Sequence, residues 1–259
     1  MSKKKKIGIS FSGGGNRAVA HIGIIKALRE NGIEADYVAG TSGGAIVGAM
    51  YAAGLSVDEM MGFAAQGKLS KLFQAKFPTR GLAGLDFLGT LLDQYINPDT
   101  FEALNIPLTV VASNLNTGKA TFLNSGPLYP AVMASCAIPL MFKPIEIENE
   151  LYVDGGIFDN MPVSPLQENC DIIIGSNVIP IVPMENDKLS SVFSISMRSF
   201  DMIVAHSAQV NFPLCDIVIE PTKTHNYGIF NFSATKELFD IGYEEATSKI
   251  AQLKNLILV

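Results

Sequence analysis

The sequence predicts an α/β fold of three layers, in which helices cover both faces of a central, mostly parallel but mixed β-sheet. Apolar, β-branched runs of strand length alternate along the chain with segments of helical periodicity, which is typical of parallel α/β sheets. One later stretch, EIENELYVDGG, alternates like the arm of a hairpin. At least one antiparallel pair is therefore expected within the sheet.

The first third of the chain supplies two strand–helix units. Residues 6–12 (KIGISFS) read as a strand, and the following helical pattern ends at Gly32. Residues 36–40 (DYVAG) read as a second strand, followed by an apolar helix that ends at Gly54. In both units a glycine-containing turn joins the strand to its helix.

Further elements follow the same alternation. Ser56 and Glu59 form a capping-box pattern that predicts the start of a helix. Pro98 suits the first position of another helix around residues 97–104. Two more apolar, β-branched runs are predicted strands: residues 106–115 and 171–179.

Composition limits the function classes. The chain has 259 residues, of which 48% are hydrophobic and 17% charged, and its net charge is −6. Such a chain folds around a large core, and its acidic balance argues against nucleic-acid binding. We expect a single domain over 1–259, with a motif-bearing core at about 5–165 and a C-terminal part, 166–259, that completes the fold and contributes to a substrate pocket.

The sequence also suggests a location. The basic run before the first strand is followed by an apolar stretch too short for a signal peptide, and no apolar run reaches the roughly 20 residues of a membrane span. The three cysteines are widely spaced, which fits structural thiols in a reducing compartment. We expect a cytoplasmic protein with transient, peripheral membrane contact, and nothing in the sequence specifies an oligomeric state.

The first glycine loop has two interpretations. Gly13, Gly15 and Ala18 match the dinucleotide-binding spacing G-x-G-x-x-G/A. The acidic residues Glu34 and Asp36, however, precede the second strand, whereas a ribose-binding carboxylate should follow it. Consecutive glycine N–H groups at a helix start also suit an oxyanion hole, which is the interpretation we prefer. A tight structural turn is the alternative.

The second loop places a serine at a sharp bend. Residues 40–44 (GTSGG) match G-x-S-x-G between a strand and a helix, the context of a nucleophile elbow. Gly40 and Gly44 are the small residues that such a bend requires on either side of Ser42. A simple Gly-Ser turn is the alternative, and the strand–helix context favours a catalytic serine.

A catalytic serine needs a base. Serine hydrolases usually use histidine, and His206 and His225 follow Ser42 in the chain, although no recognisable motif surrounds either residue. His21, in the first helix, is expected to pack or to face solvent. A Ser-His-Asp esterase that uses His206 or His225 therefore stays open as an alternative.

Asp154 is the other candidate base. It ends the alternating strand, and Gly155 and Gly156 directly after it allow another backbone or the serine to come close. Asp-Gly is also a frequent hairpin turn, so by itself this pair would indicate only a turn.

Three segments together give a specific resemblance. Residues 12–28 (SGGGNRAVAHIGIIKAL), 40–54 (GTSGGAIVGAMYAAG) and 153–163 (VDGGIFDNMPV) resemble, in order, the signature segments of the patatin-like phospholipase family. The nearest likeness is to its bacterial branch, similar to neuropathy-target-esterase-type lysophospholipases. Weaker similarity extends over nearly the whole chain.

The resemblance implies a patatin-like fold and a serine carboxylic-ester hydrolase that degrades lipids without a cofactor or a metal ion. Its Ser-Asp dyad implies Ser42 as nucleophile and Asp154 as base. Two residues depart from the family's usual pattern, since Asn16 stands where a small residue is frequent and Gly43 where Met is frequent. The remaining implied residues are the oxyanion loop, Gly13, Gly14 and Gly15, and the supporting residues Arg17, Gly40, Gly43, Gly44, Gly155 and Gly156.

The expected substrate is a lipid or another acyl ester. Phe193, Met197, Phe200 and Ile203 follow helical spacing. Packing of this face on the core is the preferred interpretation, and an acyl pocket or membrane-facing lid is the alternative. A non-catalytic lipid-binding protein on the same scaffold is a further alternative, although all three motifs are intact.

Overall fold

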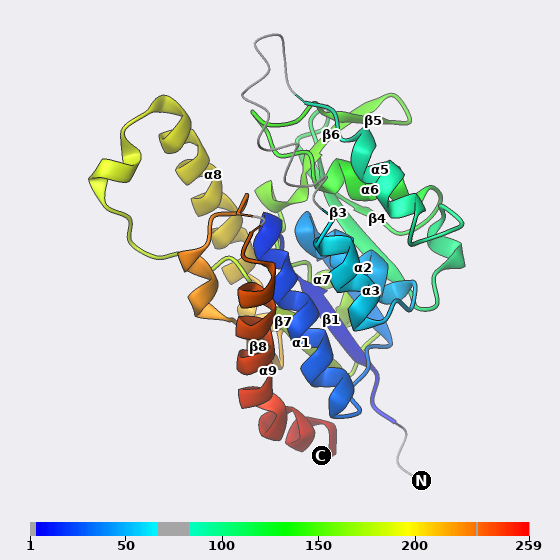
Figure 1. Ribbon diagram of the computed structural model, residues 1–259. Helices are drawn as coiled ribbons and strands as arrows, with labels where there is room; N and C mark the ends of the chain where they lie inside the picture. Colours follow the sequence, from blue (N-terminus) through cyan, green and yellow to red (C-terminus); the bar gives the residue numbers. More distant parts are fainter. Residues whose placement is uncertain (1–3, 67–82, 232, 259) are drawn as a thin grey trace.

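The centre of the molecule is a mixed sheet (Figure 1). The structure is a computed structural model that describes residues 4–66, 83–231 and 233–258. The order in its eight-stranded sheet is β5-β6-β3-β2-β1-β7-β8, and β4 pairs with β3 outside this path. The strands β3, β2, β1, β7 and β8 are mutually parallel, whereas β4, β5 and β6 pair antiparallel. Their bounds are β1 Ile7–Phe11, β2 Tyr37–Thr41, β3 Leu108–Asn114, β4 Lys119–Leu123, β5 Ile145–Ile147, β6 Glu150–Asp154, β7 Ile172–Ser176 and β8 Ile217–Ile219.

Helices surround this sheet. α1 and α9 lie side by side, and α8 projects from the body of the molecule (Figure 1). The bounds are α1 Val19–Glu30, α2 Gly43–Ala52, α3 Val57–Ala64, α5 Asp86–Asp93, α6 Leu128–Ser135, α7 Ser164–Gln167, α8 Val192–Gln209 and α9 Thr235–Leu258. Short 3-10 helices add Gly15–Ala18, Phe101–Ala103, Gly155–Ile157, Asn186–Leu189, Phe212–Leu214 and Thr222–Asn226.

Alternation along the strands divides the core between the two faces of the sheet. Val38 and Ile174 belong to the large core cluster, whereas their neighbours Ala39 and Ile173 belong to a smaller one. Successive side chains of a strand point to opposite faces, so the two clusters lie on opposite sides of the sheet. α1, α2, α3, α5, α6 and α9 pack on the first side, and α7 and the C-terminal part of α8 pack on the second. The predicted three-layer α/β fold is confirmed.

Glycines allow α1 and α9 to approach closely. A Cβ atom at Gly23 would lie 2.0 Å from the Phe239 carbonyl oxygen, and one at Gly242 would lie 1.9 Å from the Ala20 carbonyl oxygen. No side chain fits in either space. The long C-terminal helix is therefore held directly against the helix that follows the first glycine loop.

Most predicted boundaries agree with the structure. The capping box at α3 is confirmed, since Ser56 Oγ accepts from the Glu59 N–H and the Glu59 carboxylate accepts from the Ser56 N–H. The helix predicted at Pro98 is wrong, because only the 3-10 helix Phe101–Ala103 forms there. The polar groups of this segment bond instead to the loop ahead of α6, where the Phe101 N–H donates to the Gly126 carbonyl at 3.1 Å. Whether 1–259 is a single domain stays a prediction.

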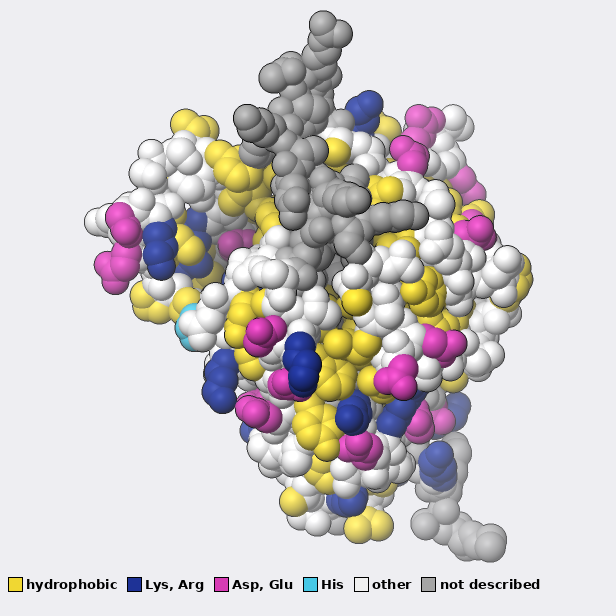
Figure 2. Space-filling model, viewed as in Figure 1, with side chains coloured by type: hydrophobic (Ala, Val, Ile, Leu, Met, Phe, Trp, Pro, Cys, Tyr) yellow, Lys and Arg dark blue, Asp and Glu magenta, His cyan; other side chains and the backbone are white. Residues whose placement is uncertain are grey.

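The prediction that the apolar face of α8 packs on the core is correct for only part of that face. Met197 and Phe200 do pack there, but Phe193 is 39% exposed and Ile203 is 48% exposed. Ile195, on the same helix, is 52% exposed. Hydrophobic side chains accordingly gather on the projecting arm that carries α8 (Figure 2). The helical spacing was read correctly, but the surface that it faces is partly open to solvent.

Among the helices that the structure describes, none is long and apolar enough to cross a membrane.

Candidate active site

The turn between β2 and α2 holds Ser42 in an unusual backbone conformation. Its φ of 54° and ψ of −125° place a non-glycine residue in a region that L-amino acids seldom adopt. Gly44 makes the bend possible, since a Cβ atom there would lie 2.3 Å from the Phe11 carbonyl oxygen. A Cβ atom at Gly40 would lie 2.5 Å from the Gly44 carbonyl oxygen. The geometry is that of a nucleophile elbow.

A buried serine from α6 anchors this bend. The Ser42 N–H donates to Ser135 Oγ at 2.7 Å, and Ser135 Oγ donates to the Val111 carbonyl at 2.6 Å. Ser135 is fully buried, so water does not compete for either hydrogen bond. The strained residue is therefore tied through one hydroxyl to the central strand β3.

The register of β3 brings Asp154 to the same bend. β4 occupies one edge of β3 along residues 110–114, so β2 and β6 must share the opposite edge. On that edge the last residue of β2 pairs with Val111, and Asp154, the last residue of β6, pairs with Ala112. Two strands that are far apart in the sequence thus end beside each other, and Ser42 meets Asp154.

Burial makes Asp154 a stronger base than an ordinary aspartate. The residue is 2% exposed, and its Oδ1 accepts a hydrogen bond from the Gly156 N–H at 2.8 Å. Burial raises the pKa of Asp154 from 3.8 to about 6, although hydrogen bonds with the Ser42 side chain and with the Gly156 N–H lower it. At neutral pH the carboxylate is mainly ionised and able to accept a proton.

Glycines also bring the first loop against the elbow. A Cβ atom at Gly13 would lie 3.0 Å from Ser42 Cβ, and one at Gly43 would lie 2.8 Å from the Gly15 carbonyl oxygen. A Cβ atom at Gly155 would lie 3.1 Å from Thr41 Cγ2, in the second motif. The three predicted motifs are thus in direct contact.

The glycine N–H groups differ in their availability. The Gly13 N–H donates to the Asn160 carbonyl oxygen at 3.0 Å and to Asn160 Oδ1 at 3.2 Å. The N–H groups of Gly14 and Gly15 donate to no acceptor within the described residues. These two, at the start of the 3-10 helix Gly15–Ala18, are the donors that are free to face a developing negative charge.

Arg17 supports the loop from outside the cavities. Its Nε donates to the Tyr227 carbonyl oxygen at 2.7 Å, which ties the 3-10 helix to a distant segment. Burial lowers the pKa of Arg17, whereas the charge of Asp201 raises it and that of Arg198 lowers it. Arg17 lines neither of the two cavities that meet at Ser42.

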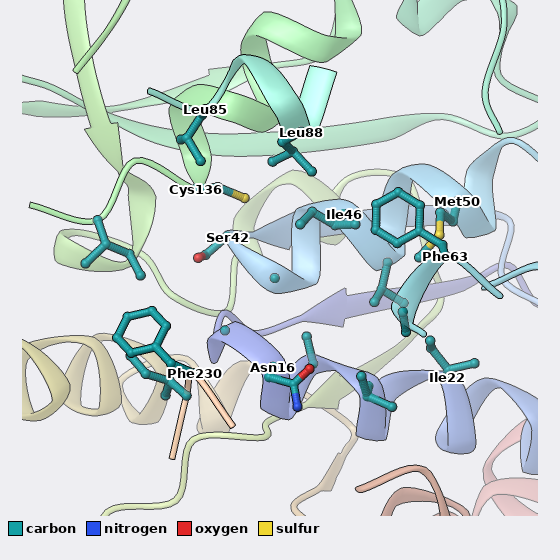
Figure 3. A pocket seen from close by; sticks show the side chains of 18 of the residues that line it. Asn16, Ile22, Ser42, Ile46, Met50, Phe63, Leu85, Leu88, Cys136 and Phe230 are labelled. Carbon is teal, nitrogen blue, oxygen red and sulfur yellow. The ribbon is translucent and has the colours of Figure 1, made fainter. Parts of the chain in front are cut away.

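The larger cavity at Ser42 is almost entirely apolar (Figure 3). It measures about 110 Å³ and extends between the elbow, α1, α3 and α5. Ser42 and Phe230 lie at one side of it, and Met50 and Phe63 lie at the other (Figure 3). Other lining residues include Ile22, Ile46, Leu85, Leu88 and Cys136.

Cys136 does not compete with Ser42 as a nucleophile. The thiol is buried in the wall of the apolar cavity. Burial raises the pKa of Cys136 well above its usual value, the charge of Asp154 raises it further, and a hydrogen bond with Ser42 lowers it. The neutral thiol is a poor nucleophile.

A second, smaller cavity adjoins Ser42 on the other side. It measures about 20 Å³ and contains the more polar part of the site. Ser42 lines both cavities, whereas Asp154, Gly14, Asn160 and Asp201 line the small one. Ser42 therefore lies where the apolar cavity meets a smaller cavity that two carboxyl side chains help to line.

The histidines lie elsewhere. His21 is fully buried, with Nδ1 2.7 Å from Ser176 Oγ and Nε2 2.9 Å from the Ser12 carbonyl oxygen, and burial lowers its pKa to about 4. His206 and His225 are exposed, and neither lines a cavity that contains Ser42. Across the described residues, no cluster of three or more His, Cys, Asp or Glu side chains is placed to hold a metal ion.

Sequence reasoning missed three residues of the site. Ser135 lies outside the three signature segments, in a stretch of weaker similarity, and only its long-range hydrogen bonds reveal its role. Asn160 falls inside the third signature segment, so its closeness to Asp154 in the sequence could have indicated that it belongs to the site. Asp201 lies between hydrophobic residues of α8, and a charged residue at such a position could have indicated a functional role.

Comparison with known proteins agrees with this geometry. A family model described as patatin-like phospholipase matches residues 9–166. An uncharacterized NTE family protein of Mycobacterium tuberculosis is 34% identical over 219 residues, which are 80% of this chain and 61% of that protein. Lysophospholipase nte1 of Emericella nidulans is 27% identical over 284 residues, which cover 97% of this chain and 18% of that protein. This chain thus spans about three fifths of the length of the mycobacterial relative, and less of the fungal one.

Solved structures support the fold alone. Human GIVD cytosolic phospholipase A2, in complex with methyl gamma-linolenyl fluorophosphonate, matches with a TM-score of 0.55 and 11% identity, over 98% of this chain and 58% of that one. VipD from Legionella pneumophila matches with a TM-score of 0.54 and 17% identity, over 98% of this chain and 67% of that one.

Proposed function

This chain belongs to the patatin-like phospholipase family, and from that premise we propose that it is a lipid acyl hydrolase in which Ser42 and Asp154 form the catalytic dyad. One observation carries the proposal. A strained, buried serine lies between an apolar cavity and a small cavity that is lined in part by a carboxylate of raised pKa. Perturbed carboxylates in such a position are typical of catalytic bases.

The reaction begins with acyl transfer to the serine. Asp154 accepts the proton of Ser42 while Ser42 Oγ attacks the ester carbonyl carbon. A carboxylate with a pKa of about 6 is a better base for this step than one at 3.8. The carbonyl oxygen then becomes an oxyanion, which the N–H groups of Gly14 and Gly15 stabilise. Loss of one such donor typically costs about 10² to 10³ in rate.

The apolar cavity determines which acyl group is accepted. Its walls are aliphatic and aromatic side chains with hardly any polar surface, so the transfer of a hydrocarbon chain from water into the cavity is favourable. Each methylene group that moves from water into such a space contributes about 0.8 kcal/mol. We therefore expect long acyl esters to be preferred over short ones until the cavity is full.

The substrate is presented at a lipid surface in this proposal. Exposed apolar side chains on α8, including Val192 at 83% and Ile195 at 52%, would be covered by contact with lipid. The net charge of −6 opposes strong attraction to anionic lipids, so the contact should be weak, reversible and little affected by salt. A cytoplasmic location with such peripheral contact stays a prediction.

Hydrolysis of p-nitrophenyl acyl esters tests the function. The protein should release p-nitrophenol, and Ser42→Ala and Asp154→Asn should each lower kcat/KM by at least about 10³-fold. Ser199→Ala is a matched control, because that exposed hydroxyl bonds only within α8, to the Ile195 carbonyl oxygen. A wild-type protein that binds the ester without cleaving it would instead indicate a lipid-binding protein on this scaffold.

The Ser-His-Asp alternative makes a different prediction. If His206 or His225 were the base, its replacement by glutamine would abolish turnover. Both residues are exposed and lie outside the cavities at Ser42, so we expect both variants to retain full activity.

A further inference from the structure

Two residues that line the small cavity beside Ser42 each carry an unpartnered polar atom. Within the described residues, three buried side-chain polar atoms are without a hydrogen-bond partner: Ser10 Oγ, Asn160 Nδ2 and Asp201 Oδ1. Asn160 and Asp201 both line the small cavity that also contains Ser42 and Asp154. A buried, unpaired donor or acceptor costs about 1 to 3 kcal/mol. A donor and an acceptor together at one cavity indicate a small ligand that both accepts and donates a hydrogen bond.

The orientation of the Asn160 amide follows from its neighbours. Asn160 is 1% exposed, and its Oδ1 accepts from the Gly13 N–H at 3.2 Å. A 180° rotation of the amide would place its NH2 group against that N–H, so that two donors faced each other. The Nδ2 group is therefore the donor that remains for the cavity.

The size of the cavity limits the ligand. It measures about 20 Å³, and a cavity needs roughly 10 to 15 Å³ to hold one water molecule. A water molecule also needs two to four polar partners, which these residues supply. Ser42, Asp154, Gly14 and Gly15 supply the other polar groups of the wall, and the remaining lining residues are apolar: Ile138, Ile179, Phe200, Val204 and Ile229.

We propose that this cavity holds the water molecule that hydrolyses the acyl-enzyme, with Asn160 Nδ2 donating to the water oxygen and Asp201 Oδ1 accepting one of its hydrogens. The proposal rests on the function proposed above. It assigns a role to both unpartnered atoms, and it places the water beside Asp154 and the acylated Ser42.

The step balances with these groups alone. The water oxygen forms a bond to the carbonyl carbon of the ester on Ser42, and Asp154 accepts a proton from the water. The bond between that carbon and Ser42 Oγ then breaks, Asp154 returns the proton to Ser42 Oγ, and the fatty acid leaves. The two hydrogen bonds direct the remaining lone pair of the water oxygen at the carbonyl carbon, from one side of the ester plane, which is the orientation that lowers the barrier.

A kinetic separation of acylation from deacylation tests this site. We would compare the wild type with Asp201→Leu and Asn160→Ala, and use Asp187→Leu, at an exposed position of the 3-10 helix Asn186–Leu189, as a matched control. In stopped-flow measurements with p-nitrophenyl butyrate, the burst phase gives the rate of acylation and the steady-state phase gives the rate of deacylation. The p-nitrophenolate leaving group needs no proton, so acylation does not depend on the water site. Labelling by a fluorophosphonate probe likewise requires Ser42 but no water.

We expect each site variant to lower the steady-state rate at least fivefold and to raise the fraction of acyl-enzyme seen by intact mass spectrometry. Asp201→Leu, which leaves the contact between Asn160 Oδ1 and the Gly13 N–H intact, should label at a rate within threefold of the wild type. Two independent variants guard against a single misfolded protein. A steady-state rate that falls less than fivefold in both would overturn the proposal, and so would labelling of Asp201→Leu that falls in parallel with its turnover. A wild-type protein that neither turns over nor labels would instead refute the proposed function itself.

Discussion

The pH dependence of kcat/KM is a direct consequence of the buried position of Asp154. The dyad needs an ionised carboxylate, and burial raises the pKa of Asp154 from 3.8 to about 6. With that value the ionised fraction is roughly 9% at pH 5 and roughly 91% at pH 7, so kcat/KM should rise about tenfold between them. An unperturbed aspartate would be almost fully ionised at both pH values, and the same ratio would differ by less than about 10%.

The assay is the initial rate of p-nitrophenyl butyrate hydrolysis between pH 4.5 and 8, at a substrate concentration far below KM. Asp159 provides the control, because burial also raises its pKa to about 6 but the residue lies outside the cavities at Ser42. Its Oδ1 accepts a hydrogen bond from Asn211 Nδ2 at 2.8 Å. Asp159→Asn should leave the midpoint near 6. A wild-type midpoint near 4, or a midpoint that disappears with Asp159→Asn, would refute the reasoning.

Three further predictions follow from the same geometry. Because the pKa of Asp154 is raised in the folded state, the stability that this residue contributes below about pH 3.8 is lost as the pH rises through about 6. Asp154→Asn should therefore be inactive yet more stable at pH 7, by up to about 3 kcal/mol in urea unfolding; equal or lower stability would contradict the burial argument. Gly44→Ala, whose Cβ would lie 2.3 Å from a carbonyl oxygen, should lower the free energy of unfolding by about 1 to 3 kcal/mol and abolish most activity. Gly48→Ala, whose Cβ would lie 3.2 Å from a side-chain carbon, should have smaller effects on both, and equal effects of the two variants would contradict the role of the elbow. Ile195→Asp should lower partitioning into neutral lipid vesicles roughly tenfold in a sedimentation assay, with turnover of soluble esters unchanged; unaltered partitioning would mean that α8 is not the contact surface.

Local patterns were sufficient for much of the fold. The strands before Ser12 and Ser42 are short apolar runs, and each is followed by a glycine turn and a helix with clear apolar periodicity. The capping box at Ser56 involves only neighbours in the sequence, so it was visible without tertiary information. At Pro98 the local preference for a helix lost to long-range hydrogen bonds, which sequence periodicity does not report.

The site was only partly predictable for the same reason. The motif residues Ser42 and Asp154 could be named, but their meeting depends on two strands that share one edge of β3. Ser135 and Asn160 act through contacts with residues 93 and 147 positions away in the chain. No spacing rule covers such distances, and only the folded register reveals them.

The availability of the oxyanion donors was likewise beyond sequence reasoning. Three consecutive glycines suggested three equivalent N–H groups, yet the N–H of Gly13 is occupied by Asn160 in the folded chain. The contribution of the loop therefore rests on Gly14 and Gly15. This assignment stays a prediction, which substitution of Gly14 by alanine would test through kcat at constant stability.

The central claim is that Ser42 is the nucleophile of a lipid acyl hydrolase, and covalent labelling tests it most directly. The wild-type protein would be treated with a long-chain alkyl fluorophosphonate, and the modified residue would be identified by peptide mass spectrometry, with Ser42→Ala treated in parallel. We predict one adduct per chain, located on Ser42, complete loss of ester hydrolysis in step with labelling, and no adduct on Ser42→Ala. An adduct on another residue, or ester hydrolysis that survives in Ser42→Ala, would contradict the account.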